Sequence, residues 1–135
     1  MLKKFKLKTK YNEVCDITEQ VKKTVEESGV KEGTCLVYNP HSTAGLAVFS
    51  PWDPDGFIDL DEEIRRLVPT RIDFKQQHDT PQDSAGHVKS ALIGISGNFI
   101  IPEGKLMTGG SQAIYFLEFD GPRNREFFVK IQADN

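Results

Sequence analysis

Residues 3–11, Lys3-Lys4-Phe5-Lys6-Leu7-Lys8-Thr9-Lys10-Tyr11, alternate between lysine and larger or less polar residues from Lys4 onward. Successive side chains of a β-strand point to opposite faces, so this pattern predicts a half-buried antiparallel strand with a lysine-coated outer face. We interpret the lysine row as a solvated face that discourages pairing at a sheet edge, in preference to a binding strip.

A helix is predicted to follow this strand. Its N-cap is expected at Asp16 or Thr18, and Gly29 is expected to end it. The apolar stripe at helical spacing is narrow. It consists of Ile17, Val21, Val25 and Ser28.

Residues 34–38 and 44–49 are rich in β-branched and apolar side chains, which predicts two strands joined by the polar turn that holds His41. Residues 51–56 are a dense turn signal. An apolar face at helical spacing then predicts a second helix over 57–68.

The third predicted helix begins near Asp83 or Ser84, with Asp83 a natural N-cap, and ends at Gly94. The side chains expected to face inward are those of Val88, Ala91 and Leu92.

Three short strands are predicted last, at 99–101, 113–119 and 126–131. The order of elements favours the α+β class, as a single two-layer domain over residues 1–135 with a mainly antiparallel sheet and helices packed on one face. A chain of 135 residues is long enough for one hydrophobic core and too short for two comfortable ones.

Composition excludes several classes of protein. A net charge of -3 argues against a binder of duplex nucleic acid, and no apolar run is long enough to span a bilayer. The N-terminus lacks the apolar region of a secretory signal, so we expect a cytoplasmic protein without nucleic-acid or membrane partners. Cys15 and Cys35 are isolated, and we expect two buried reduced thiols.

The stretch His78-Asp79-Thr80-Pro81-Gln82-Asp83-Ser84-Ala85-Gly86-His87 holds two of the three histidines in the chain, and His41 is the third. All three lie in polar segments. Three histidines with an open fourth position are the ligand set of a catalytic zinc site, so we predict that His41, His78 and His87 converge on one divalent metal, with zinc the expected ion. Asp83 is placed to orient an imidazole. The alternative is that each histidine only hydrogen-bonds a loop.

A glycine-rich turn and two arginines are candidates for anion binding. Successive glycines free main-chain N–H groups to form an anion-binding concavity; the residues concerned are Thr108, Gly109, Gly110 and Ser111. A plain connecting turn is the alternative. Arg123 and Arg125 could bind a phosphate or carboxylate through bidentate hydrogen bonds, or form surface salt bridges.

Glu118 is a further candidate. It shares a predicted strand face with Ile114 and Phe116 in an apolar segment, so it is either partnered or outward-facing. With Asp83 and the three histidines it completes the set of candidate catalytic residues.

Together these segments resemble the largely uncharacterised YjbQ-like family, whose members are often described as secondary thiamine-phosphate synthases. The matching segments are 41–46, 78–79, 83–89, 92–94, 104–106, 112–114 and 118–125. The resemblance implies a compact α+β subunit, usually in a homotrimer, with the three histidines at one polar pocket. This chain has Asp83 where the family usually has asparagine. It has Gly109-Gly110-Ser111-Gln112 where the family usually has Gly-Thr-Trp-Gln, which removes an aromatic wall that could stack on a heteroaromatic substrate.

Two functions follow as expectations. One is a small metal-dependent enzyme acting on phosphorylated metabolites. In the reaction that the resemblance implies, a transferase joins a pyrimidine diphosphate to a thiazole phosphate and releases pyrophosphate. The other is a non-catalytic homotrimer that binds a metal or a phosphorylated metabolite. Both functions need the same polar groups.

Overall fold

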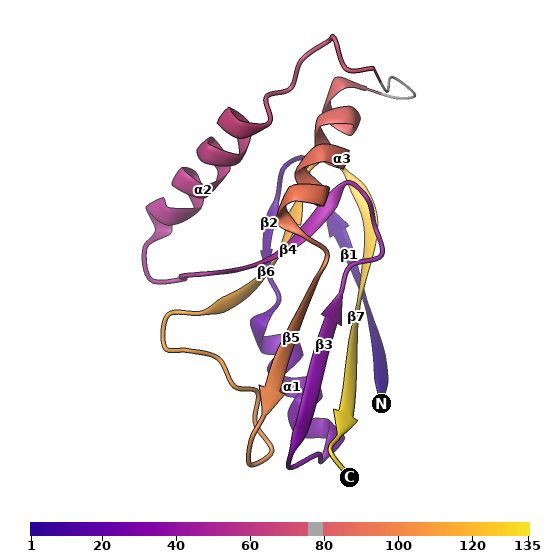
Figure 1. The fold of residues 1–135 in the computed structure, drawn as a ribbon, viewed down its shortest axis with the longest axis vertical. Coiled ribbons are helices and arrows are strands. Elements are labelled where there is room, and N and C mark those ends of the chain that lie inside the picture. Colours follow the sequence, from indigo (N-terminus) through magenta and orange to yellow (C-terminus); the bar gives the residue numbers. More distant parts are fainter. Residues whose placement is uncertain (76–79) are drawn as a thin grey trace.

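The computed structural model describes residues 1–75 and 80–135 of the chain. The terminal strands lie side by side along the length of the molecule (Figure 1). In chain order the elements are β1 (Leu2–Thr9), β2 (Val14–Asp16), α1 (Thr18–Ser28), β3 (Gly33–Tyr38), β4 (Ala44–Phe49), α2 (Pro54–Leu67), α3 (Pro81–Ile93), β5 (Ser96–Ile101), β6 (Ala113–Glu118) and β7 (Arg123–Ala133).

Within the described residues, the strands form two antiparallel sheets. The large sheet has the order β1-β7-β3-β5, and the small sheet has the order β2-β6-β4. In the large sheet Thr9 lies opposite Arg123, and Tyr38 lies opposite Phe128. Because β3 and β4 belong to different sheets, the turn that carries His41 crosses from one sheet to the other.

Strand β6 is buried along its whole length. Its alternate side chains enter two hydrophobic clusters, with Phe116 in the first and Tyr115 in the second. The first cluster lies among the two sheets and α1, and the second joins β6 to α2. A strand covered on both faces needs apolar side chains on both, which explains its nearly unbroken apolar sequence.

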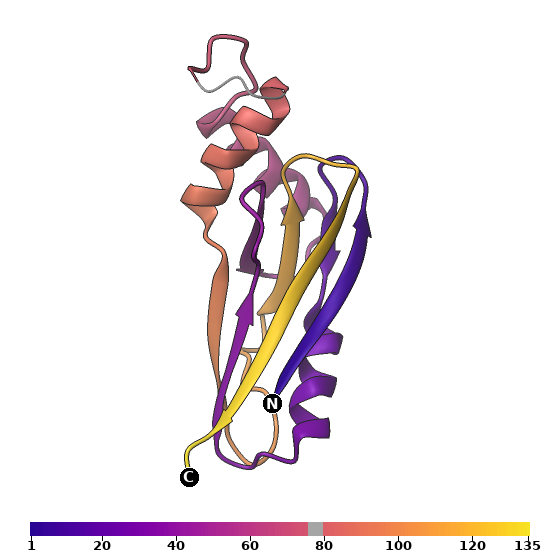
Figure 2. The same ribbon diagram turned by 90° about the vertical axis from the view of Figure 1, so that its right-hand side faces the viewer.

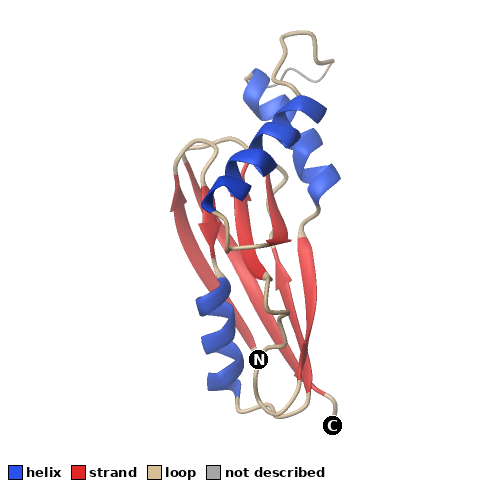
Figure 3. Ribbon diagram, turned by 90° about the vertical axis from the view of Figure 1, so that its left-hand side faces the viewer, coloured by secondary structure: helices blue, strands red, loops and turns tan. Residues whose placement is uncertain are grey.

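The helices lie at opposite ends of the molecule (Figures 2 and 3). Helix α1 buries Val21 and Val25 in the first cluster, between the two sheets, whereas α2 contributes Ile64 to the second cluster. Helix α3 packs on β4. Across residues 1–75 and 80–135, every helix is too short or too polar to traverse a bilayer.

The predicted α+β class with a mainly antiparallel arrangement is confirmed. The division of the strands between two packed sheets is an additional finding. The turn after β3 carries the chain from the large sheet to the small one, so β3 and β4 do not pair as a hairpin.

The helix N-termini differ from the predictions. Ile17 occupies the N-cap of α1 without a side-chain hydrogen bond, although Asp16 Oδ1 accepts from the N–H of Thr18 at 2.9 Å. Gly29 ends α1 as predicted, in the left-handed conformation with φ 71°. Residues 54–56, predicted as part of a turn, form the first turn of α2, with Asp53 as its cap.

The predicted cap and inward face of α3 were wrong. Thr80 is the N-cap, and its hydroxyl accepts from the N–H of Asp83 at 3.1 Å. Val88 and Leu92 are 41% and 67% exposed, and Ala91 is also exposed. The buried face is small or polar, and consists of Asp83, Ser84, Ala85, Gly86, Lys89 and Ser90.

Close packing explains why α3 buries small side chains. A Cβ atom at Gly86 would lie 3.2 Å from the carbonyl oxygen of Phe119 and 3.3 Å from Cβ of Thr43. The helix therefore approaches the end of β6 and the turn after β3 too closely for large side chains at this position.

Candidate functional site

Glu118 and Arg125 form a buried ion pair that joins the two sheets, since Glu118 ends β6 and Arg125 lies on β7. Their side chains are 0% and 5% exposed. Arg125 Nε donates to Glu118 Oε1 at 2.7 Å, and Nη2 of the same guanidinium donates to Oε2. This two-bond geometry is the strongest form of a carboxylate–arginine contact. Glu118 is thus partnered and inward-facing.

Further donors complete the hydrogen bonding of Glu118. The Thr9 hydroxyl donates to Oε1 at 2.5 Å, and the N–H of Asp120 donates to Oε2 at 3.1 Å. Burial opposes ionisation of Glu118, but the hydrogen bonds from Arg125 and Thr9 prevail and lower its pKa below the ordinary glutamate value. The carboxylate is therefore held charged inside the protein.

Arg125 also reaches the turn after β3. Its Nη2 donates to the Thr43 hydroxyl at 2.8 Å and to the Thr43 carbonyl at 3.3 Å. The guanidinium, predicted as an anion ligand, is thus directed at Glu118 and Thr43. It connects β6, β7 and the His41 turn.

His41 takes the place of a strand partner for β7. Strand β3 pairs with β7 only as far as Tyr38 opposite Phe128. Beyond that point the N–H of Glu126 donates to His41 Nε2 at 2.9 Å. Burial and then the positive charge of Arg125 lower the pKa of His41, with partial opposition from nearby carboxylates.

Asn39 holds the His41 turn in shape. Its side chain is fully buried, with Oδ1 accepting from the N–H of His41 and Nδ2 donating to the carbonyl of Ala44, both at 2.9 Å. A buried amide that satisfies two main-chain groups across a turn restricts its conformation.

His87 belongs to a separate charged cluster at the start of α3. Its Nε2 lies 3.3 Å from Asp83 Oδ2, and the other Asp83 oxygen lies 3.8 Å from Arg123 Nη2. Arg123 also donates to Asp120 at 2.7 Å. Asp83 therefore lies between an imidazole and a guanidinium, as expected for a carboxylate that orients a histidine.

Two adjoining depressions lie over β1 and β7. One, of about 390 Å³, is lined by Lys6, Leu7, Lys8, His41, Asn124, Arg125 and Glu126. The other, of about 660 Å³, is lined by Lys8, Thr9, Pro122, Arg123 and Asn124. They adjoin because Lys8 and Asn124 line both.

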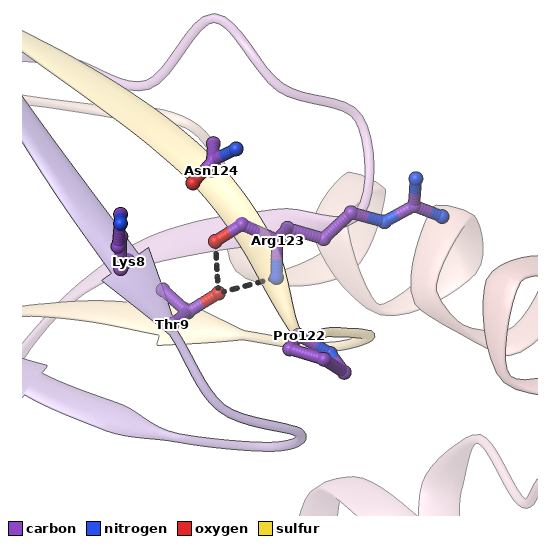
Figure 4. Close-up of a pocket in the computed structure, with 5 residues that line it drawn as sticks. All are labelled: Lys8, Thr9, Pro122, Arg123 and Asn124. Carbon is purple, nitrogen blue, oxygen red and sulfur yellow. Dashed lines mark hydrogen bonds between the residues drawn. The ribbon is translucent and has the colours of Figure 1, made fainter.

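Figure 4 shows how the second depression is built. The Thr9 hydroxyl accepts from the N–H of Arg123 at 3.2 Å and lies 3.1 Å from the carbonyl oxygen of Arg123, which fixes the end of β7 against β1. The Arg123 side chain extends away from Lys8 and Asn124, toward the helices. Arg123 thus lines the depression with its main chain while its guanidinium contacts Asp83 and Asp120.

The glycine-rich turn lies away from these groups. Ala113, which follows the turn, pairs with Phe49 at one end of β4, whereas Glu118 pairs with Ala44 at the other end. Five residue steps along a strand separate the two ends by roughly 17 Å. Within one chain, Thr108, Gly109, Gly110 and Ser111 are therefore not brought to the histidines or to Arg123 and Arg125.

Trp52 contacts the glycine-rich turn. Its indole Nε1 donates to the carbonyl of Gly110 at 2.9 Å, and the side chain remains 73% exposed. An indole thus lies beside the segment in which the family's usual tryptophan is replaced.

The predicted metal site includes one ligand that the structure does not describe. His78 lies outside the described residues, as does Asp79. Of the other two predicted ligands, His41 offers Nε2 to Glu126 and His87 offers Nε2 to Asp83. Over residues 1–75 and 80–135, no three side chains of histidine, cysteine, aspartate or glutamate gather in a metal-binding arrangement. The zinc ion stays a prediction.

Both cysteines are free thiols, with Cys35 buried and Cys15 half-buried. Burial raises the pKa of each to about 11, with the Cys15 value also raised by the carboxylates of Glu13 and Glu118. Thiols that remain protonated at neutral pH are poor nucleophiles and poor metal ligands.

Sequence reasoning missed several residues of this region. Lys6 and Lys8 lie on the exposed face of β1, as the solvated-face interpretation predicted, but their position beside a depression was not predicted. The roles of Thr9, Asn39 and Thr43 carried no recognisable signal. The lysine alternation is visible in the sequence. The position of the His41 turn beside β7 is not, because it depends on the crossing of the chain from one sheet to the other.

Comparison with known proteins agrees with this architecture. Residues 3–134 match the family described as UPF0047 protein YjbQ-like. The UPF0047 protein MJ1081 of Methanocaldococcus jannaschii is 41% identical over 135 residues, which cover 99% of this chain and 96% of that protein. The UPF0047 protein YugU of Bacillus subtilis is 36% identical over 98% of this chain and 100% of its own.

Solved structures show the same fold. A protein of the yjbq/upf0047 family from Clostridium acetobutylicum is 42% identical, with a TM-score of 0.89 over 96% of this chain and 98% of that chain. A YbjQ-like protein of unknown function from Sulfolobus solfataricus is 30% identical, with a TM-score of 0.92 over 99% of this chain and 97% of its own. The chain therefore belongs to the UPF0047, YjbQ-like family.

Proposed function

We propose that this protein binds a phosphorylated small molecule in the adjoining depressions over β1 and β7, and that the Asp83–His87 pair beside them exchanges a proton with it. The observation that carries the proposal is the group of cationic and neutral donors lining these depressions, in a chain whose net charge is -3.

Lys6 and Lys8 supply the positive charge. They lie two residues apart on the same face of β1, roughly 7 Å along the strand. Among the described residues neither forms an ion pair, whereas Lys4 on the same face contacts Glu126 at 3.6 Å. Two ammonium groups without carboxylate partners beside the Asn124 amide form a suitable site for a phosphate group.

The Asp83–His87 pair supplies a group for proton transfer. Asp83 is buried, and the His87 side chain is 41% exposed, so the carboxylate can orient the imidazole while one ring edge remains open to a ligand. A histidine oriented by a carboxylate is a common general base. Arg123 connects this pair to the depressions, because it contacts Asp83 and lines the larger one.

The joining of a pyrimidine diphosphate to a thiazole phosphate is one reaction that such a site could serve, and it rests on the family resemblance. In that reaction the lysines would hold the diphosphate and stabilise the charge that develops on the leaving pyrophosphate. The proposal of a bound phosphorylated molecule is independent of this choice of substrate.

Thermal unfolding in inorganic phosphate and pyrophosphate tests the proposal. A ligand that binds only the folded protein raises the unfolding temperature. We expect both anions to raise it, and the Lys6→Ala/Lys8→Ala variant to lose most of the increase. Arg123→Ala is expected to reduce the increase.

Lys130→Ala is the matched control, because Lys130 is an exposed lysine of the large sheet that pairs with Leu2 at the far end of β1. It should retain the full increase. An equal loss in Lys130→Ala would show nonspecific attraction of anions to lysines, and no increase in the unaltered protein would overturn the proposal.

A further inference from the structure

The two histidines in the described residues face polar partners of opposite kind, a hydrogen-bond donor at His41 and a carboxylate at His87. His41 Nε2 faces a main-chain N–H, that of Glu126, at 2.9 Å. His87 Nε2 faces a carboxylate oxygen, Asp83 Oδ2, at 3.3 Å. A neutral imidazole carries one hydrogen, and the partner of each nitrogen decides which nitrogen holds it.

For His41, the N–H of Glu126 requires a lone pair on Nε2, so the hydrogen lies on Nδ1. No described residue accepts a hydrogen bond from that Nδ1. Among the described residues no buried side-chain nitrogen or oxygen lacks a hydrogen-bond partner, so this Nδ1 is accessible. Because His41 lines the depression that holds Lys6 and Lys8, its N–H is available to a ligand there.

For His87, the arrangement is reversed. An ionised carboxylate only accepts hydrogen bonds, which favours the hydrogen on Nε2. The Nδ1 atom of His87 then keeps its lone pair. Arg123 Nη2 lies on the other side of Asp83, 3.8 Å from its second oxygen.

We infer that His41 is held as the Nδ1–H tautomer and donates this hydrogen to a phosphate oxygen of the bound ligand, whereas His87 is held as the Nε2–H tautomer and presents Nδ1 as a proton acceptor. The donor role of His41 rests on the proposed function, and the two tautomers do not. Glu118 and Arg125 are positioning residues in this arrangement, because they hold Thr43 and β7 and so set the distance between His41 and Glu126.

This assignment separates the histidines that the sequence placed together. With its Nε2 lone pair facing Glu126 and a hydrogen on Nδ1, His41 has no nitrogen left for a metal ion. His87 retains a free lone pair.

Nitrogen-15 NMR of the unaltered protein tests the assignment. Long-range proton–nitrogen spectra distinguish the protonated from the unprotonated ring nitrogen. At neutral pH we expect His41 to show a protonated Nδ1 and His87 a protonated Nε2, so each ring is a control for the other. Titration with inorganic phosphate is expected to shift His41 Nδ1–H together with the amide signals of Lys8 and Asn124.

Each outcome has a distinct consequence. Protonated Nε2 on His41, or the same tautomer on both rings, would overturn the inference. The expected tautomers with shifts at Lys8 and Asn124 but none at His41 would overturn its donor role and leave the proposed function standing. The expected tautomers with no shift at any residue would overturn the donor role together with the proposed function.

A variant supplies the quantitative test. A hydrogen bond to a charged group is worth roughly 1.5–3 kcal/mol, so His41→Ala should weaken phosphate binding by about tenfold or more. Lys130→Ala, outside the depressions, should bind as the unaltered protein does. Unchanged phosphate affinity in His41→Ala would overturn the donor role.

Discussion

The N–H of Glu126 donates to His41 Nε2 at 2.9 Å, just past the point where β3 leaves β7. A side chain from the turn thus completes the hydrogen bonding that a longer β3 would have supplied. The same residue lines the depression that Lys6 and Lys8 also line. Local strand pairing and the candidate site are therefore linked through one residue.

Loss of the Glu118 charge is expected to destabilise the fold strongly. Glu118→Gln leaves the Arg125 charge buried without its counter-ion, which costs about 3–5 kcal/mol in the free energy of unfolding. Denaturant unfolding measures it. In the exposed pair of Lys3 and Glu27, at 3.4 Å, the control Glu27→Gln should cost less than about 1 kcal/mol. If the two variants lost the same free energy of unfolding, the buried pair would contribute no more to stability than the exposed pair does.

The same pair predicts the acid sensitivity of the protein. Because the pKa of Glu118 is lowered by folding, its ionisation stabilises the protein fully above about 4.3, the ordinary glutamate value. That contribution is lost as the pH falls through the lower value of the folded state. Unfolding free energies measured between pH 7 and pH 3 should decline less steeply in Glu118→Gln. If the free energy of unfolding declined equally with pH in the variant and the unaltered protein, groups other than Glu118 would cause the acid sensitivity.

Close approach at Gly86 predicts a second stability effect. Gly86→Val places atoms against Phe119 and Thr43, where a Cβ alone would be 3.2–3.3 Å from its neighbours, so we expect a loss of about 1–3 kcal/mol. Ala91→Val introduces the same β-branched residue at an exposed position of the same helix and is the control. Similar unfolding temperatures for the two variants would contradict the packing argument.

The predicted zinc ion can be sought by equilibrium dialysis. If zinc binds, His87→Ala should lose it, since His87 retains a free lone pair, whereas His41→Ala should keep it. Affinity should fall below about pH 6.5, where imidazole becomes protonated. Loss of zinc in His41→Ala would contradict the tautomer assignment, and no zinc in the unaltered protein would show the metal prediction to be wrong.

The predicted homotrimer can be tested by light scattering. Strand β5 is an edge of the large sheet, and Ile100 on it is 58% exposed. We expect the mass of three chains at micromolar concentration, and a lower mass for Ile100→Lys because a charge would oppose burial of this edge. Ile58→Lys, at a site on α2 that is 55% exposed, is the control. A monomeric mass for the unaltered protein would end the prediction.

Sequence patterns predicted those elements whose environment is simple. The alternation after Lys4 gave β1 correctly because one of its faces meets solvent and the other meets the core. The apolar stripe of α1 likewise predicted correctly that Val21 and Val25 are buried. On α3 the pattern predicted the wrong inward face. Neighbouring segments lie so close to this helix that small side chains are favoured on its buried face, and Val88 and Leu92 are exposed.

The candidate site was only partly predictable for a related reason. Glu118 and Arg125 could each be identified as unusual, but their contact crosses between two sheets. Spacing along the chain carries no information on such a contact. The glycine-rich turn was grouped with the arginines by its composition, whereas strand register places it at the opposite end of β4.

Burial of β6 on both faces has a consequence for how the molecule opens. Because the side chains of this strand enter both hydrophobic clusters, releasing the strand from its sheet would disrupt both clusters at once. The amide hydrogens of β6 should accordingly exchange with solvent only through complete unfolding, while those at the exposed end of α2 exchange by local fraying. Glu118 is the last residue of β6. Its buried contact with Arg125 therefore belongs to the segment of the chain that is expected to open least often.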